Sequence, residues 1–205
     1  DAVEAKYRGR IYFPGKISRD CGEGKYDIAY DDGDKEENVD ARLISKLTCD
    51  EALLVLDAGD AINALVAFKD LATGAPRLAC ASRKKVLVFD PVAGGDALLV
   101  LDIGFEVKAL AVFKEPATGS PRLACGSNDN KVRIFDAVSG GDALLVLDAG
   151  DKVFALVMFK DLATGALRLA SGSWDNKKVR VFDPVVGGEA LVVLEGHRDP
   201  VWALA

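Results

Sequence analysis

The sequence lacks residues and patterns on which several common functions depend. It contains a single histidine, His197, so a metal site built from two or more histidines is excluded. No apolar run approaches the roughly 18–20 residues that a membrane-spanning helix needs. The 32 acidic residues outnumber the 26 basic ones and give a net charge of −6, whereas proteins that coat nucleic acids are basic. We therefore expect neither a membrane nor a nucleic acid as partner.

Recognisable catalytic and metal motifs are missing too. The chain has no glycine-rich phosphate loop, no GxSxG nucleophile elbow and no HExxH pair. Its four cysteines, at positions 21, 49, 80 and 125, form no CxxC pair and no zinc-type spacing. His197 as a catalytic base would have no partner nucleophile. We therefore expect no enzymatic activity, no cofactor and no metal, in a reducing compartment that is nuclear or cytoplasmic.

The aromatic residues that are present divide the chain into two unlike parts. All four tyrosines lie within the first 30 residues, and both tryptophans lie within the last 32. This uneven distribution predicts a domain boundary, which we place between a first domain of residues 1–48 and a second of residues 49–205.

Internal repetition dominates the second part. The hexapeptide Ala-Leu-Leu-Val-Leu-Asp begins at Ala52, Ala97 and Ala143, and a related hexapeptide begins at Ala190. The successive spacings are 45, 46 and 47 residues, and the added residues fall mainly in one turn. A stacked repeat tolerates such variation because turns face solvent while strands keep their register. The copies are residues 52–96, 97–142 and 143–189, with a partial copy at 190–205.

Each copy has a strand-like pattern and no helical period. In the third copy, apolar or alternating segments are separated by short turns that contain Gly, Pro, Asp or Asn. Cys80, Cys125 and Ser171 occupy one register of the repeat, which predicts a small buried position and not half of a disulfide. We expect four strands per repeat, placed in the third copy at residues 153–159, 167–173, 178–183 and 190–194.

The third copy resembles the WD-repeat family through the segment Arg-Leu-Ala-Ser-Gly-Ser-Trp-Asp-Asn-Lys-Lys-Val-Arg-Val-Phe-Asp at 168–183. That resemblance implies a β-propeller of four-stranded blades. Phe-Asp stands where Trp-Asp is usual, so the indole N–H of the family's hydrogen-bonded cluster is missing. The Gly-His pair of the family occurs once, at Gly196. The resemblance implies structural roles in the blades for Ser171, Asp175, Phe182 and His197.

The number of copies predicts an open arc. In WD propellers each blade takes its outer strand from the neighbouring repeat, which makes residues 52–56 an orphan outer strand and residues 200–205 a lone inner strand. Three full blades are fewer than the four to eight that close a ring. We therefore expect a fragment of a longer protein, monomeric or associating through its open edges. Assembly of open arcs into a closed homo-oligomer is the alternative.

The first part has a different pattern. Short apolar segments between glycine turns in residues 3–46 predict a small, curved five-strand barrel. The stretch Tyr-Phe-Pro-Gly-Lys-Ile-Ser-Arg-Asp at 12–20, Gly-Lys-Tyr at 24–26 and Tyr-Asp-Asp-Gly at 30–33 resemble a Tudor domain of the royal family. The fold class predicted for the whole chain is all-β, with a small SH3-like Tudor barrel followed by a partial, three-blade WD-type β-propeller.

The Tudor resemblance implies an aromatic cage for a methylated ammonium group, held by cation–π attraction. Matched by position, the cage residues are Tyr7, Phe13 and Tyr30, with Asp32 as an acid that accepts the N–H of a dimethyl group. Asp34 stands where a relative has a further aromatic residue. The implied ligand is a methylated lysine or arginine peptide, for example from a histone.

A second interpretation of these residues remains open. Aromatic side chains in a small barrel are often core, and we expect this of Tyr26 and Ile28. The acidic stretch at 31–40 is equally typical of a solvated face. The sequence thus supports two hypotheses: a non-enzymatic chromatin scaffold that reads methylated peptides and binds other proteins through its WD repeats, or a purely structural WD-repeat interaction protein whose barrel has no reading activity.

Overall fold

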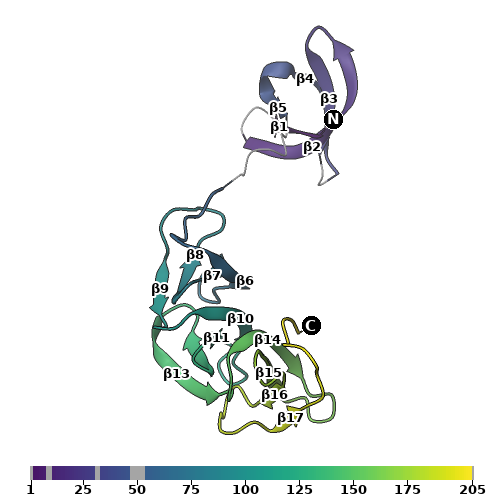
Figure 1. The fold of residues 1–205 in the computed structure, drawn as a ribbon. Coiled ribbons are helices and arrows are strands. Elements are labelled where there is room, and N and C mark those ends of the chain that lie inside the picture. Colours follow the sequence, from purple (N-terminus) through teal and green to yellow (C-terminus); the bar gives the residue numbers. More distant parts are fainter. Residues whose placement is uncertain (1, 8–10, 31–32, 47–53, 205) are drawn as a thin grey trace. The chain divides into compact units, whose positions relative to one another are not determined.

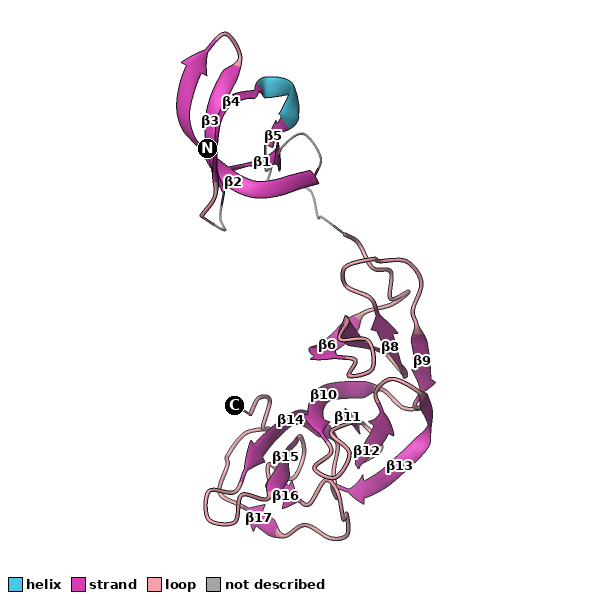
Figure 2. Cartoon of the chain, turned by 180° about the vertical axis from the view of Figure 1, so that it is seen from behind, coloured by secondary structure: helices cyan, strands magenta, loops and turns pink. Residues whose placement is uncertain are grey.

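The computed structural model describes residues 2–7, 11–30, 33–46 and 54–204 (Figure 1). The chain divides into two compact units, residues 1–53 and 54–205. The boundary predicted at residue 48 lies outside the described residues. Strands account for nearly all the regular structure, as Figure 2 shows, so the all-β prediction is confirmed.

The first unit is one antiparallel five-stranded sheet. A tight turn at Glu23 and Gly24, both with positive φ, joins its second and third strands. A short 3₁₀ helix, Ala41–Leu43, follows the fourth strand, and the Asp40 carboxylate caps it by accepting from the Arg42 N–H. The strand order is β4-β3-β2-β1-β5. The strands are β1 (Ala2–Tyr7), β2 (Ile11–Gly22), β3 (Lys25–Tyr30), β4 (Lys35–Asp40) and β5 (Ile44–Lys46).

This sheet does not close into the expected barrel. In the described residues β4 and β5 are the two edges of the sheet and do not pair with each other. The 3₁₀ helix lies between these two strands in the chain, and β5, which has only three residues, pairs with β1. Ile28 is fully buried, and Tyr26 packs against the small core as predicted.

The second unit consists of three antiparallel four-stranded sheets, each of which takes its first three strands from one copy and its fourth wholly or mostly from the next. Within each sheet the strands follow chain order, so the four strands per repeat predicted from the sequence are confirmed. Sheet 1 contains β6 (Ile62–Lys69), β7 (Pro76–Ser82), β8 (Lys85–Phe89) and β9 (Leu99–Asp102). Sheet 2 contains β10 (Val107–Lys114), β11 (Pro121–Ser127), β12 (Lys131–Asp136) and β13 (Gly140–Asp148). Sheet 3 contains β14 (Val153–Lys160), β15 (Leu167–Ser173), β16 (Val179–Phe182) and β17 (Val192–Leu194).

Consecutive sheets of the second unit pack face to face, with β10 lying between β6 and β14 (Figure 1). Alternating side chains cause this packing, because the strands of sheet 2 present apolar residues to both neighbouring sheets. Val88 of sheet 1 packs with Leu123 and Phe135 of sheet 2. Ile134 of sheet 2 packs with Phe182 of sheet 3 in the same way.

Glycine permits the closest approach between sheets 2 and 3. A Cβ added at Gly126 would lie 2.4 Å from the Val153 Cγ1 atom. The same contact recurs one repeat later, where a Cβ at Gly172 would lie 2.6 Å from the Val201 Cγ1 atom. Val201 therefore occupies, on sheet 3, the position that Val153 occupies on sheet 2.

The described parts of the two predicted orphan segments are not strands. Residues 54–57 and 200–204 belong to no sheet, because neither segment has a partner strand among the described residues. Their side chains nonetheless follow the repeat. A Cβ at Gly94 would lie 2.6 Å from a Leu54 methyl group, as one at Gly140 would lie 2.5 Å from a Leu99 methyl group.

The cysteine prediction is confirmed for the described part of the repeat. Cys80 and Cys125 are free thiols, and together with Ser171 they are at most 2% exposed. Burial raises the pKa of the Cys125 thiol far above its usual range. No helix in the described residues has the length and apolar character needed to cross a membrane.

Candidate functional site

The loops of the three sheets lie at two opposite ends of the second unit, which we call the turn end and the opposite end. The opposite end carries the turns between the first and second strands and between the third and fourth strands of each sheet. The turn end carries the short turns β7–β8, β11–β12 and β15–β16 together with the connections that lead from one sheet to the next. Backbone hydrogen bonds tie these segments together. The Val107 N–H donates to the Arg83 carbonyl at 2.7 Å, and the Asn128 N–H donates to the Glu106 carbonyl at 2.9 Å.

The opposite end repeats one ion network in each sheet. In sheet 2 the Arg122 guanidinium donates to the Glu115 and Asp136 carboxylates, and its side chain is 16% exposed. The same arginine position in sheet 1 binds two aspartates, and in sheet 3 it binds one at 3.1 Å. These pairs join the beginning of the second strand of each sheet to the end of the third strand and, in sheets 1 and 2, also to the turn that precedes the second strand.

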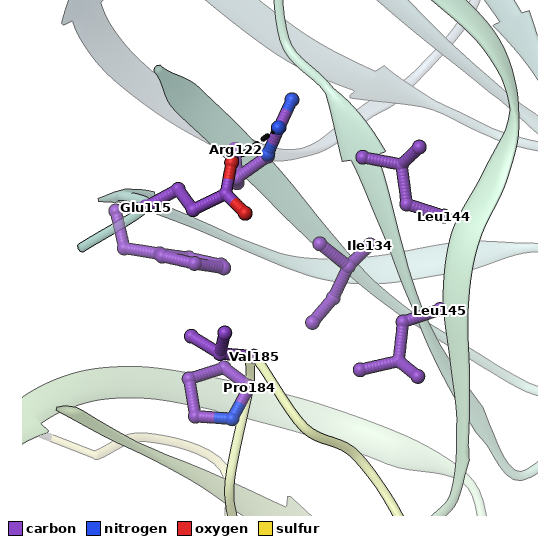
Figure 3. A pocket seen from close by; sticks show the side chains of 8 residues that line it. Glu115, Arg122, Ile134, Leu144, Leu145, Pro184 and Val185 are labelled. Carbon is purple, nitrogen blue, oxygen red and sulfur yellow. Dashed lines mark hydrogen bonds and ion pairs between the residues drawn. The ribbon is translucent and has the colours of Figure 1, made fainter. Parts of the chain in front are cut away.

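A groove of about 260 Å³ opens beside this network between sheets 2 and 3 (Figure 3). Apolar side chains from both sheets form most of it, including Ile134, Leu145 and Val185. Because the guanidinium of Arg122 already binds two carboxylates, it has little capacity to bind a ligand in the groove. We therefore assign this end a structural role.

The carboxyl groups of the network are held ionised. Burial opposes ionisation of Asp136, but the N–H groups of Ser139 and Val138 and the Arg122 guanidinium outweigh it and lower the pKa of that carboxyl. Hydrogen bonds from Thr118 and Arg122 lower the pKa of Glu115.

The turn end differs in chemistry from sheet to sheet. In sheet 2 the Arg133 guanidinium donates to the Ser127 hydroxyl at 3.2 Å and to the Asp129 carboxylate at 3.1 Å. Arg133 also lies 6.0 Å from the centroid of the Phe105 ring. Burial raises the pKa of the Asp129 carboxyl, but hydrogen bonds from Arg133 and Ser127 outweigh it, and the pKa is lowered overall. This turn is therefore internally satisfied.

In sheet 3 the turn end presents an aromatic cluster of Phe154, Trp174 and Trp202. The two tryptophan ring centroids lie 4.4 Å apart, and Phe154 lies 4.8 Å from Trp174 and 5.5 Å from Trp202. Trp202 is 60% exposed. The Lys108 ammonium lies 5.8 Å from the Phe154 ring centroid, within cation–π range.

Of the residues predicted for the methyl cage, only Tyr30 has a described side chain. It is 5% exposed, belongs to the core of the first unit with Ile28 and Val39, and donates to the Glu36 carboxylate at 3.0 Å. The backbones of Tyr7 and Phe13 lie on β1 and β2, where the two strands pair. Asp32 lies outside the described residues.

The residues predicted to stabilise the blades lie in different environments. Ser171 and Phe182 are fully buried, and the Ser171 hydroxyl has no hydrogen-bond partner among the described residues. The Asp175 carboxylate instead binds the Lys152 ammonium at 3.3 Å. His197 is exposed. The structure therefore does not bring these four residues into one cluster.

Sequence reasoning missed the two features that organise the ends. The Arg122 network joins residues that are 7 and 14 positions apart, and nothing in their spacing marks them as partners. The aromatic cluster could have been anticipated in part, because Trp174 falls in a turn of the third copy and Trp202 in the partial copy that follows. In the described residues no group of three or more His, Cys, Asp or Glu side chains could hold a metal.

Comparisons with known proteins bear on the fold. No family model matches the sequence, and no curated protein matches it either. Among solved structures, the computationally designed Ika4 protein has a TM-score of 0.56 at 24% identity, over 76% of this chain and 86% of that one. The designed Ika8 protein has a TM-score of 0.57 at 21% identity, over 91% of this chain and 51% of that one.

A natural complex is similar as well. A chain of an active polycomb repressive complex 2 in the basal state has a TM-score of 0.54 at 17% identity, over 68% of this chain and 31% of that one. The present chain thus spans about half or less of the larger matches. At these identities the likeness concerns the fold alone, and it supports a propeller-like stack of repeat sheets.

Proposed function

We propose that this chain is a non-enzymatic binding protein whose repeat sheets form a protein-interaction platform at the turn end. The single observation that carries the proposal is a contrast between the two ends. The opposite end has an arginine–carboxylate ion pair at the same position in every sheet. The turn end differs from sheet to sheet: it has a basic turn in sheet 1, an internal ion pair in sheet 2 and an aromatic cluster in sheet 3. A fixed frame with variable turns is how repeat folds build recognition surfaces.

The exposed aromatic cluster supports the same interpretation. Tryptophan is enriched among the residues that dominate binding energy at protein interfaces. Trp202 packs edge-on against the rings of Trp174 and Phe154 and leaves more than half of its own surface exposed to a partner.

Replacing Trp202 by alanine in the full chain is expected to weaken binding of a captured partner by about tenfold or more, as loss of an interface tryptophan does. Partners would first be captured with the wild-type chain, and each affinity would then be measured by biolayer interferometry. Leu162→Ala is the matched control, because Leu162 is fully exposed in the β14–β15 turn at the opposite end. Equal losses for both variants would contradict the proposal.

For the first unit we propose reading of methylated lysine or arginine. The strand register supports it, because Tyr30 lies opposite Gly15 on β2, two residues beyond Phe13, and Phe13 lies opposite Ala5 on β1. The three aromatic positions therefore fall on three neighbouring strands. Burial of Tyr30 supports the alternative, in which this unit has only a packing role.

Replacing Asp32 by asparagine separates these two proposals. A carboxylate that accepts the N–H of dimethyl-lysine contributes a charge-assisted hydrogen bond, so its loss is expected to weaken binding of a dimethylated histone-like peptide by about tenfold. Binding of the trimethylated peptide should change less, because trimethyl-lysine has no such N–H. Tyrosine chemical shifts in NMR titrations would follow binding, with Glu37→Gln as the control. Equal or absent binding of methylated and unmodified peptides would leave the packing role.

A further inference from the structure

Sheet 1 has an open groove at the turn end that its sister sheets fill with their own side chains. The groove has a volume of about 430 Å³, within the range of ligand sites. Leu87 and Val100 form its apolar floor, and Val100 is half exposed. The rest of its lining comes from the β7–β8 turn, residues 82–85, and from residues 58–60.

The strand register explains why the groove is open. Leu87 pairs with Val100, as Arg133 pairs with Val146 in sheet 2 and Arg180 pairs with Val193 in sheet 3. The long arginine of sheet 2 extends over its strand to Asp129 and lies near the ring of Phe105. In sheet 1 the shorter leucine leaves this space unfilled.

The turn beside the groove is strongly basic, whereas its counterpart in sheet 2 carries one acid and one base. Sheet 2 has Asn-Asp-Asn-Lys after Ser127, whereas sheet 1 has Arg83-Lys84-Lys85 after Ser82. All three basic side chains are exposed. Arg83 binds the Asp60 carboxylate at 2.9 Å, and no carboxylate lies within ion-pair distance of Lys84 or Lys85 among the described residues. The β11–β12 turn of sheet 2 thus contains an acidic residue, Asp129, whereas the β7–β8 turn of sheet 1 contains none.

The basic turn is rigidly placed. The Arg83 and Lys84 carbonyls accept hydrogen bonds from the N–H groups of Val107 and Ile103, which lie at the start of sheet 2. The Ser82 hydroxyl donates to the Ala58 carbonyl at 3.0 Å on the other side of the groove. Three further acids lie around the turn: the Asp57 and Asp102 carboxylates each accept from the N–H of a turn glycine, and Glu106, which interacts electrostatically with Arg83, binds the Lys108 ammonium. The two lysines are therefore held beside the apolar floor without a fixed partner.

We propose that this groove binds an acidic peptide segment of a partner protein, with a bulky apolar side chain on Leu87 and Val100 and a carboxylate at Lys84 and Lys85. The peptide would supply the acid that Asp129 supplies within sheet 2, and its apolar side chain would fill the space that Arg133 fills there. The inference rests on the proposed platform function and names the chemistry of one partner. A protein with a net charge of −6 and only three basic residues here is better matched to a short acidic peptide than to a nucleic acid.

The test uses the full chain and a labelled peptide in which glutamates flank one leucine and one phenylalanine, followed by fluorescence anisotropy. The wild-type chain should bind it, and binding should weaken as salt is added. Peptides with glutamine for glutamate, or with alanine for the two apolar residues, should bind at least about tenfold more weakly. A single-stranded oligonucleotide is the competing ligand, and tighter binding of it would overturn the proposal.

Two variants locate the site. Leu87→Arg combined with Lys84→Asp rebuilds the arginine–aspartate pair of sheet 2 and is expected to abolish peptide binding. Lys84→Gln with Lys85→Gln keeps Leu87 and should weaken binding by about tenfold with no loss of stability. Lys114→Gln with Lys160→Gln removes the same charge elsewhere and should bind as the wild type does. Unchanged binding in the first two variants would overturn the inference, while the platform function would still be tested by Trp202→Ala.

Discussion

Replacing Phe182 by alanine is expected to lower the free energy of unfolding of the second unit by about 3–5 kcal/mol, the usual cost of emptying a buried phenylalanine position. The side chain is fully buried at the interface of sheets 2 and 3, where it packs with Phe113, Ile134 and Leu169. Its removal therefore takes apolar contacts from two sheets at once.

The protein carries its own probe for this measurement. Both tryptophans, Trp174 and Trp202, lie in the aromatic cluster beside sheet 3, so their fluorescence during urea unfolding reports on that sheet. Phe159→Ala is the control, because Phe159 belongs to the same sheet but is 41% exposed. We expect a loss below about 1 kcal/mol for it, as for other surface positions. Similar losses in the two variants would show that the sheets are not packed as described.

The repeat made the second unit predictable. Strands expected at 153–159, 167–173 and 178–183 differ by at most one residue at either end from β14, β15 and β16. The prediction succeeded because the same alternating apolar pattern occurs in each copy, and because glycine and aspartate identify the turns between the strands. The end segments were predicted less well, because a strand needs a hydrogen-bonded neighbour that a local pattern does not reveal.

The first unit shows a different limit. A period-two pattern assigns side chains to one of two faces of a strand, but it does not say which face is covered. Tyr30 is therefore compatible with both a cage wall and a core residue in the sequence, and only the packing of Ile28 and Val39 places it in the core. Closure of the barrel depended on pairing between β4 and the three-residue β5, which composition does not determine.

The candidate site at the turn end was only partly visible for a related reason. The two tryptophans and the Arg83-Lys84-Lys85 run stand out in the sequence, but their roles depend on what the neighbouring sheet places beside them. Leu87 is a clear example. Leu87 occupies in sheet 1 the strand position that Arg133 occupies in sheet 2. The groove is open because the leucine side chain is shorter than the arginine side chain.

Replacing Arg122 by methionine is expected to destabilise the second unit at pH 7 by more than the loss of a solvent-exposed ion pair does, because the Arg122 side chain is only 16% exposed. Methionine retains much of the side-chain volume but leaves Asp136 and Glu115 without the guanidinium that both carboxylates bind. Lys152→Met is the control. The ion pair of Lys152 with Asp175 is solvent-exposed, and its loss should change stability little.

The effect of Arg122→Met should depend on pH in a defined direction. Folding lowers the pKa values of Asp136 and Glu115. The stability that these carboxyl groups contribute is therefore fully present when the pH is above their pKa in the unfolded chain, which is about 4. That stability is lost as the pH falls through the lowered folded values. Without the guanidinium both pKa values should rise, so the difference between wild type and variant should shrink from pH 7 to pH 3 in urea unfolding. A difference that stayed constant over this range would mean that Arg122 acts through packing of its aliphatic stem and not through its charge.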